Sequence, residues 1–292
     1  MKMIMVFIDG LGIGSDNASN PFMAADIPYW HTLVDNFGYL PADAQLGVAG
    51  LPQSATGQTS IYTGENAPKA MGRHFSTRPT DTLVRLIEQK NIFTALQKRG
   101  YTVTFANIYT EEYLEQMKKK PKCIFKPSVT TLMNMTAGIP FRVIEDYRKG
   151  CGVYHDITGE ALRERGYDVP VISAEAAAEN LFRISRSCDF TLFEFFVSDL
   201  AGHSKAMGKA VEILERMDRF IGHLLQMMNL NEEVLVIVSD HGNIEDLSIS
   251  THTMNPVPVF FVTRIEEARK VKILDITDIF SSVLQFFPEI DK

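Results

Sequence analysis

Aspartate and histidine residues stand beside several short apolar runs of this chain, where they could bind metal ions. Asp9 follows the run at 3–8, and Asp240 with His241 follows the run at 234–238. The whole set of such residues is Asp9, Asp199, His203, Asp240, His241 and His252. Carboxylate and imidazole groups are ligands of zinc, manganese and magnesium in proteins. The set therefore predicts a metal centre.

Each of these residues also has a simple structural explanation when it is considered alone. The pair Asp9-Gly10 suits a turn after a strand, because Asp and Gly adopt turn geometry readily. Asp199 and His203 are four residues apart and could form a surface pair on one helix face. However, residues that end neighbouring parallel strands converge on one crevice, and this convergence favours a shared site.

The size of the set indicates two divalent cations rather than one. Three carboxylates and three histidines supply more ligands than a single catalytic ion with open positions uses. We expect manganese or zinc, and magnesium is an alternative, because geometry and availability decide among these ions.

A serine in the small, hydroxylated segment 50–64 could act as a nucleophile. Ser54 begins the sequence SATGQTSIYTG, which is typical of a short helix that ends at Gly64. Ser is a preferred helix N-cap, so we predict that Ser54 caps this helix. A helix N-terminus also attracts phosphate through its free N–H groups and its dipole. Both roles are compatible, and Ser54 is the candidate nucleophile.

Short apolar runs alternate with amphipathic stretches along most of the chain. Runs with the length and composition of buried strands occupy 3–8, 103–106, 191–197, 234–238 and 257–262. Between two of them, apolar residues from Val211 to Leu225 recur every three or four positions, as on one helix face. The alternation predicts an α/β fold: a doubly wound, mostly parallel sheet with helices on both faces.

One region departs from this rhythm and is predicted to be a small insert or cap. Residues 110–170 contain the lysine run from Lys118 to Lys120, several turn signals and only short apolar pieces. The preceding segment 91–107 is typical of a helix, a glycine stop and a strand, and therefore belongs to the core. The predicted core comprises residues 1–109 and 171–292.

Taken together, the motifs resemble those of the alkaline phosphatase superfamily, in the branch of cofactor-independent phosphoglycerate mutase and phosphopentomutase. Asp9-Gly10, SATGQTSIYTG, SDLAGH, SDHGN and THTMNPVP occur in that family's order and rough spacing, up to about residue 262. The resemblance implies an alkaline phosphatase-like fold and a transiently phosphorylated Ser54. It assigns one ion to Asp199, His203 and His252, and a second ion to Asp9, Ser54, Asp240 and His241.

The chain also departs from the mutase pattern. Gln58 stands where the mutases have a histidine, and only residues 110–170 are available in place of the large second domain of phosphoglycerate mutases. A mutase must retain its dephosphorylated intermediate and exclude water, whereas a hydrolase admits water. We therefore expect a phosphomonoester hydrolase or phosphotransferase. The alternatives are a phosphomutase acting on a sugar phosphate or phosphoglycerate, and a non-catalytic metal-binding relative.

Several basic residues follow the serine segment and could contact an anionic substrate. They are Lys69, Arg73, His74, Arg78 and Arg85. Most charge runs are solvated surface, but Arg73, His74 and Arg78 are candidates for substrate binding. His155, in the predicted insert, could face the crevice and is a fourth candidate.

The composition excludes several other classes of protein. A hydrophobic fraction of 45% with 22% charged residues is typical of globular chains. A net charge of -7 is unfavourable for sequence-independent binding to nucleic acid, and no apolar stretch approaches the roughly 18 residues that span a bilayer. Three cysteines without a CxxC pair suggest neither disulfides nor a cysteine zinc site. We expect a cytoplasmic enzyme that acts on a small phosphorylated metabolite, with no membrane or nucleic-acid partner.

Overall fold

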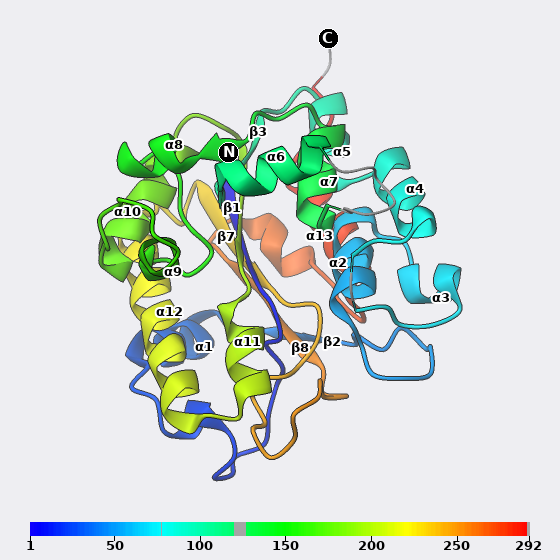
Figure 1. Cartoon of the computed structure of the whole chain (residues 1–292). Coiled ribbons are helices and arrows are strands. Elements are labelled where there is room, and N and C mark those ends of the chain that lie inside the picture. The colour runs from blue at the N-terminus through cyan, green and yellow to red at the C-terminus, as the bar shows by residue number, and fades with distance from the viewer. Residues whose placement is uncertain (77, 120–126, 291–292) are drawn as a thin grey trace.

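The computed structural model describes residues 1–76, 78–119 and 127–290, and its centre is a six-stranded sheet. The strand order is β2-β8-β7-β1-β6-β3 (Figure 1). The strands are β1 (Lys2–Ile8), β2 (Leu40–Ala42), β3 (Val103–Phe105), β6 (Phe190–Phe195), β7 (Glu233–Val238) and β8 (Val257–Val262). β1 is parallel to β6 and β7, and β3 is parallel to β6, whereas β8 is antiparallel to β7 and β2. The predicted mostly parallel sheet is confirmed.

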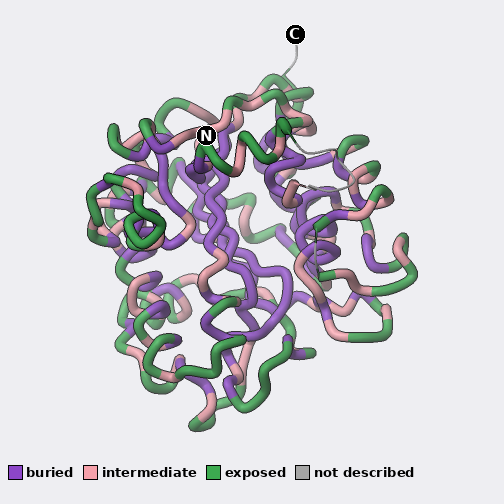
Figure 2. Tube along the Cα trace, viewed as in Figure 1, coloured by how far each residue is buried: buried purple, intermediate pink, exposed green. Residues whose placement is uncertain are grey.

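Helices cover both faces of this sheet. One face packs against α2 (Ser54–Thr63), α4 (Asp81–Gln89), α5 (Ile92–Lys98), α7 (Val129–Thr136) and α13 (Asp278–Gln285). The other face packs against α1 (Pro28–Phe37), α10 (Ala174–Ser185), α11 (Val197–Ser204) and α12 (Met207–Met227). Alternate residues of β1 point to opposite faces, so Met3 lies in the first core and Ile4 in the second. Figure 2 shows the buried trace concentrated in the strands between these layers.

The register of the strands brings the residues that follow them to one edge. Ile8 at the end of β1 pairs with Phe195 at the end of β6, and Phe7 pairs with Val238 at the end of β7. Segments that are far apart in the sequence therefore leave the sheet side by side.

The predicted insert at residues 110–170 contributes to two different parts of the molecule. It contains α6 (Glu111–Lys119), α7, β5 (Arg142–Val143), α8 (Ile144–Arg148) and α9 (Glu160–Glu164). β5 pairs in parallel with β4 (Ile108–Tyr109). Helix α7 packs into the first core, whereas the segment that includes α8 and α9 forms a small apolar cluster of its own. The division at 110 and 170 stays a prediction, and Lys120 lies outside the described residues.

Shorter elements complete the described fold. They are α3 (Ala67–Met71) and the 3-10 helices η1 (Pro21–Met23) and η2 (Glu266–Lys270). Among the helices in the described ranges, none combines the length and the apolar character that crossing a membrane requires.

Candidate metal centre

The predicted ligands that follow β1 and β7 lie together at the edge of the sheet. Ligand atoms of Asp9, Asp240 and His241 are all within 4.8 Å of one another. The His241 Nε2 atom is 3.3 Å from Asp9 Oδ1 and 3.6 Å from Asp240 Oδ2. These three side chains are buried, and their arrangement can hold one cation.

A second group of ligands lies beside the first. Asp199, His241 and His252 also offer atoms within 4.8 Å of one another, and the rings of His241 and His252 stack with centroids 3.7 Å apart. His203 belongs to this group as well, because its Nε2 atom is 3.3 Å from both Asp199 Oδ2 and His252 Nε2. Asp199 and His203 lie one turn apart on α11 and are part of the site, not an isolated surface pair.

Two backbone carbonyls orient the histidines of the second group. His252 donates from Nδ1 to the carbonyl of Pro52 over 2.8 Å, and His203 donates from Nδ1 to the carbonyl of Ser250 over 3.0 Å. A carbonyl can only accept, so Nδ1 carries a proton in each ring, and Nε2 has a free lone pair whenever the ring is neutral. Both Nε2 atoms can therefore bind a cation.

Ser54 lies at the start of α2, beside His241. Its Oγ atom is 2.9 Å from His241 Nε2, and the side chain lines the main cavity. The prediction that Ser54 caps the helix is wrong: Ser54 is the first helical residue, and Gln53 occupies the N-cap position without a side-chain bond. The extended backbone of Gln53 shifts the helix start by one residue and leaves the serine hydroxyl free for the site.

Burial and neighbouring carboxylates raise the proton affinity of the two carboxylates that follow β1 and β7. Burial raises the pKa of Asp9 well above its usual range, and the charges of Asp240 and Asp199 raise it further. Burial together with the charge of Asp199 raises the pKa of Asp240 to about 8. Like charges in a buried site resist joint ionisation, and a bound dication would remove this resistance.

In the second group, the pKa of the carboxylate, Asp199, is lowered instead of raised. Burial would raise the pKa of Asp199, but the hydrogen bond with His252 and the charge of His241 outweigh burial and bring the pKa to about 2. Burial opposes charge on His252, yet its contact with Asp199 raises its pKa. Burial and the charge of His252 lower the pKa of His241 to about 3, so His241 is neutral near pH 7 and able to bind a cation.

Buried oxygen atoms without a donor show that the site fits cations. Asp9 Oδ1 and Asp240 Oδ2 have no hydrogen-bond partner among the described residues. Buried acceptors are normally satisfied, because an unsatisfied one costs free energy. Carboxylate oxygens beside imidazole nitrogens are also a ligand set for divalent metals.

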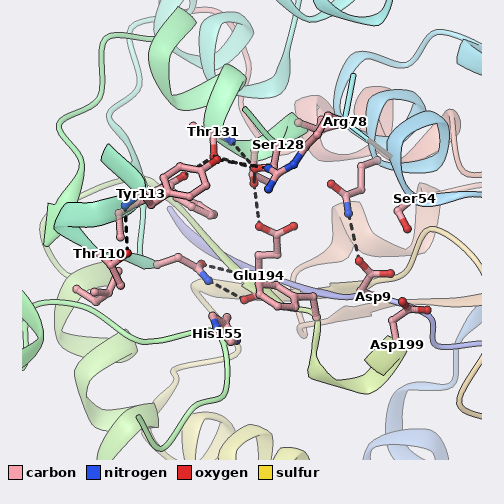
Figure 3. A pocket seen from close by; sticks show the side chains of 18 of the residues that line it. Asp9, Ser54, Arg78, Thr110, Tyr113, Ser128, Thr131, His155, Glu194 and Asp199 are labelled. Carbon is pink, nitrogen blue, oxygen red and sulfur yellow. Dashed lines mark hydrogen bonds between the residues drawn. The ribbon is translucent and has the colours of Figure 1, made fainter. Parts of the chain in front are cut away.

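A cavity of about 780 Å³ opens from the metal centre, and Figure 3 shows the side chains that line it. Asp9, Ser54 and Asp199 form one end of this cavity. Its far wall includes Arg78, Tyr113, Ser128, Thr130, Thr131, His155, Arg165 and Glu194. The cavity therefore joins the reactive end to a wall rich in hydroxyl and charged groups.

The structure separates the predicted substrate contacts into two groups. Arg78 and His155 line the main cavity, whereas Arg73 and His74 line a separate hollow of about 520 Å³. The His155 ring stacks on Phe196 at 4.1 Å, and burial lowers its pKa to about 3, so it is a neutral wall of the cavity. Arg78 contacts the ring of Tyr113 at 6.0 Å.

Sequence reasoning missed Glu194, a buried carboxyl group in the far wall. It lies in β6, accepts a 2.8 Å hydrogen bond from Thr130, and has a pKa raised by burial to about 7. The Asn107 side chain holds its backbone through two hydrogen bonds of 2.7 and 2.8 Å. The signal in the sequence was the single charged residue in the apolar run TLFEFFV. A strand that is buried on both faces rarely contains a charged residue.

Gln58, which stands where the mutases have a histidine, makes one contact with the site. Gln58 lies in α2 and donates from Nε2 to Asp9 Oδ2 over 3.3 Å. An amide here fixes one oxygen of a predicted ligand but adds no positive charge.

The chain is similar in sequence to known metal-dependent enzymes over part of its length. Residues 163–287 match the model of the Metalloenzyme superfamily. The 2,3-bisphosphoglycerate-independent phosphoglycerate mutase of Prochlorococcus marinus is 35% identical over 126 residues, which are 38% of this chain and 23% of the mutase. The mutase of Thermococcus gammatolerans is 26% identical over 152 residues, which are 47% of this chain and 36% of the mutase. The matched segments thus span well under half of these relatives.

Solved structures share the fold over the whole chain. A protein of Pyrococcus horikoshii matches with a TM-score of 0.61 and 16% identity, covering 100% of this chain and 98% of its own. The cold-active alkaline phosphatase of Shewanella matches with a TM-score of 0.58 and 12% identity, covering 99% and 100%.

The whole chain therefore shares its fold with solved alkaline phosphatases. In sequence, residues 163–287 are similar to the Metalloenzyme superfamily, and the similarity to phosphoglycerate mutases covers less than half of the chain.

Proposed function

We propose that this protein transfers the phosphoryl group of a small phosphomonoester to Ser54 and then to water or a second hydroxyl group. Asp199, His203 and His252 hold one divalent cation, and Asp9, Ser54, Asp240 and His241 hold a second. Manganese or zinc suits this ligand set best. The contacts of 3.3 to 3.6 Å among these side chains support the assignment.

The position of Ser54 carries the proposal. Its hydroxyl is at the first residue of a helix, 2.9 Å from His241 Nε2, and it faces the cavity. The N–H groups of the first helical turn and the helix dipole favour a phosphate there. A hydroxyl group is a weak nucleophile at neutral pH, so it needs the charged neighbours that this site provides.

The proposed chemistry is two successive displacements at phosphorus. Two divalent cations, when bound, supply positive charge that lowers the pKa of the serine hydroxyl and offsets charge on the attacking and leaving oxygens. Ser54 Oγ bonds to phosphorus and gives up its proton, while the ester P–O bond breaks and the released alcohol takes up a proton. Water then attacks the phosphoserine, and Ser54 Oγ recovers a proton as phosphate leaves.

The far wall of the cavity accommodates the alcohol part of the ester. Hydroxyl groups of Ser128 and Thr131 and the guanidinium of Arg78 line it, and they can bind a polar metabolite. His155 and Phe196 offer a flat apolar surface beside them. We therefore propose a small phosphorylated metabolite as the substrate.

Hydrolysis is the favoured fate of the phosphoserine, and mutase activity is the second candidate. The described residues of 110–170 cover the cavity with short helices and loops, which favours access of water. The sequence matches with phosphoglycerate mutases favour the alternative. Phosphorus NMR distinguishes them, because a mutase releases almost no inorganic phosphate from its own substrate.

The nucleophile is tested with a generic aryl phosphate and the manganese-loaded protein. Ser54→Ala should abolish turnover while circular dichroism and the unfolding temperature stay close to those of the unmodified protein. EDTA should silence the unmodified protein, and manganese or zinc should restore it. Unchanged turnover by the Ser54→Ala variant would exclude the phosphoserine route.

A further inference from the structure

Glu245 is a buried carboxylate that no step of the proposed chemistry uses. It lies five residues after Asp240, in the loop that follows β7 (Glu233–Val238), and only 1% of it is exposed. A buried charge is stable only when it is paired or well hydrogen-bonded. The partners of Glu245 therefore indicate what it does.

Four donors from three separate segments converge on this carboxylate. The backbone N–H groups of Gly12 and Asn243 donate to Oε2 over 3.0 and 2.7 Å. The Thr253 hydroxyl and the Asn255 amide donate to Oε1 over 2.5 and 3.0 Å. Each oxygen of Glu245 thus accepts two hydrogen bonds, so this buried group has no unsatisfied acceptor.

Each of the three segments also carries proposed metal ligands. Gly12 follows Asp9 by three residues, Asn243 follows His241 by two, and Thr253 directly follows His252. Asn243 in turn donates from Nδ2 to Asp199 Oδ1 over 2.6 Å. One carboxylate therefore links the loops that hold both groups of ligands.

The backbone of the neighbouring loops packs closely against the Glu245 carboxylate. A Cβ atom added at Gly12 or at Gly242 would overlap the Glu245 carboxylate, and one at Gly242 would also overlap the Thr253 hydroxyl. The backbone approaches the carboxylate this closely because these two residues have no side chain. The conformation of these loops therefore depends on close packing against Glu245.

We propose that Glu245 is a positioning residue, which sets the spacing of the metal ligands by holding the loops after β1, after β7 and before β8 in one cradle. This inference rests on the proposed function only in taking the two ligand groups as cation sites. Groups that orient ligands from behind typically change metal affinity by about 10- to 100-fold when they are removed.

Glu233 offers a matched control at the opposite end of the same strand. It is also a buried glutamate, 6% exposed, which accepts from the Asn229 N–H group over 2.9 Å and pairs with Arg186. It stands at the start of β7, whereas the ligands follow the end of that strand. Glu233→Gln should therefore cost stability without altering the ligand cradle.

Manganese binding to the full-length protein tests the proposal without any substrate. Isothermal titration calorimetry of the metal-free protein with manganese chloride should give a Kd that is about 10- to 100-fold weaker for Glu245→Gln. Glu233→Gln should stay within about twofold of the unmodified protein. Thr253→Val should also weaken binding, and Thr253→Ser, which keeps the hydroxyl, should restore it. Manganese EPR of the bound ion should broaden in Glu245→Gln as the ligand geometry becomes less uniform.

Several results would overturn the proposal. They are a Kd of Glu245→Gln within about twofold of the unmodified protein, an equal weakening by Glu233→Gln, or equal affinities for Thr253→Val and Thr253→Ser. The threonine pair decides the question if Glu245→Gln does not fold. Absence of manganese binding by the unmodified protein would exclude this proposal and the metal centre together. Turnover by Ser54→Ala with a weakened Glu245→Gln site would exclude only the proposed nucleophile.

Discussion

The two ends of the main cavity are built in different ways. At the metal end, Asp9 and Asp240 directly follow parallel strands, so the register of the sheet fixes where they lie. The far wall is assembled from α6, α7 and the loops around Arg78 and His155, together with Glu194 of β6. The proposed chemistry is tied to the strand ends, and substrate choice depends mostly on the elements packed around the sheet. The far wall can therefore change while the metal end stays the same.

The first prediction tests this difference by replacing one carboxylate at each end of the cavity with its amide. Asp240→Asn should lower kcat/KM by about 10³-fold or more, equivalent to about 4 kcal/mol of barrier, because a buried ligand charge is lost. Glu194→Gln should change the manganese Kd far less, because Glu194 is not a proposed ligand and acts on Asp9 only through its charge. Steady-state kinetics and calorimetry on both variants check this expectation. A similar loss of manganese affinity in both would mean that the two ends act as one site.

The second prediction concerns the pH dependence of stability at the far wall. The pKa of Glu194 is about 7 in the folded protein, above its ordinary value of 4.5. The folded state therefore binds this proton more tightly, and the resulting stability is present below about pH 4.5 and lost as the pH rises through about 7. The full loss is at most about 3 kcal/mol.

Glu194→Gln removes this titration and so isolates it. In metal-free protein, the unfolding free energy of the variant minus that of the unmodified protein should increase from pH 5 to pH 8. Urea denaturation at fixed ionic strength measures the difference. A difference that stays flat over this range would show that Glu194 ionises in the folded state as it does in the unfolded chain.

Much of the fold and of the metal end could be predicted from the sequence, because both depend on local order. Most of the strands are short apolar runs, and every proposed aspartate or histidine ligand except His203 stands within five residues of a strand. Ser54 stays a predicted nucleophile, but its predicted position in the helix was wrong by one residue, since the extended backbone of Gln53 decides where the helix begins.

The far wall and the cradle could not be predicted in this way. The roles of Glu194 and Glu245 depend on Thr130 and Thr253, and on backbone groups that approach only in the folded chain. A charged residue in an apolar run indicates that the residue has a specific role. Its hydrogen-bond partner, however, is brought to it by long-range packing and cannot be identified from the sequence. The same reasoning separates Arg73 from Arg78, which stand five residues apart in the sequence and line different hollows.

The third prediction concerns how much manganese binding stabilises the folded protein. If both ligand groups bind divalent ions only in the folded state, manganese at 100 times its Kd should raise the unfolding free energy by about 2.7 kcal/mol for each ion bound. The acidic residues that raise one another's pKa should make this gain smaller at low pH, because the proton competes with the metal. Thermal unfolding with and without manganese at pH 5.5 and pH 8 tests both statements. Asp240→Asn is the control and should lose most of the gain.

The smallest effect belongs to the far wall, and two arginines from the same basic run provide a matched test. Arg78→Ala should lower kcat/KM for a polar phosphorylated metabolite by about tenfold, the value of one charge-assisted hydrogen bond to the substrate. Arg73→Ala removes the same charge from the separate hollow and should change kcat/KM by less than about twofold. With an aryl phosphate, which lacks the polar groups, the two variants should differ little. Equal losses for both arginines with the metabolite would mean that the basic run acts through its overall charge, and the distinction between the two hollows would then have no functional meaning.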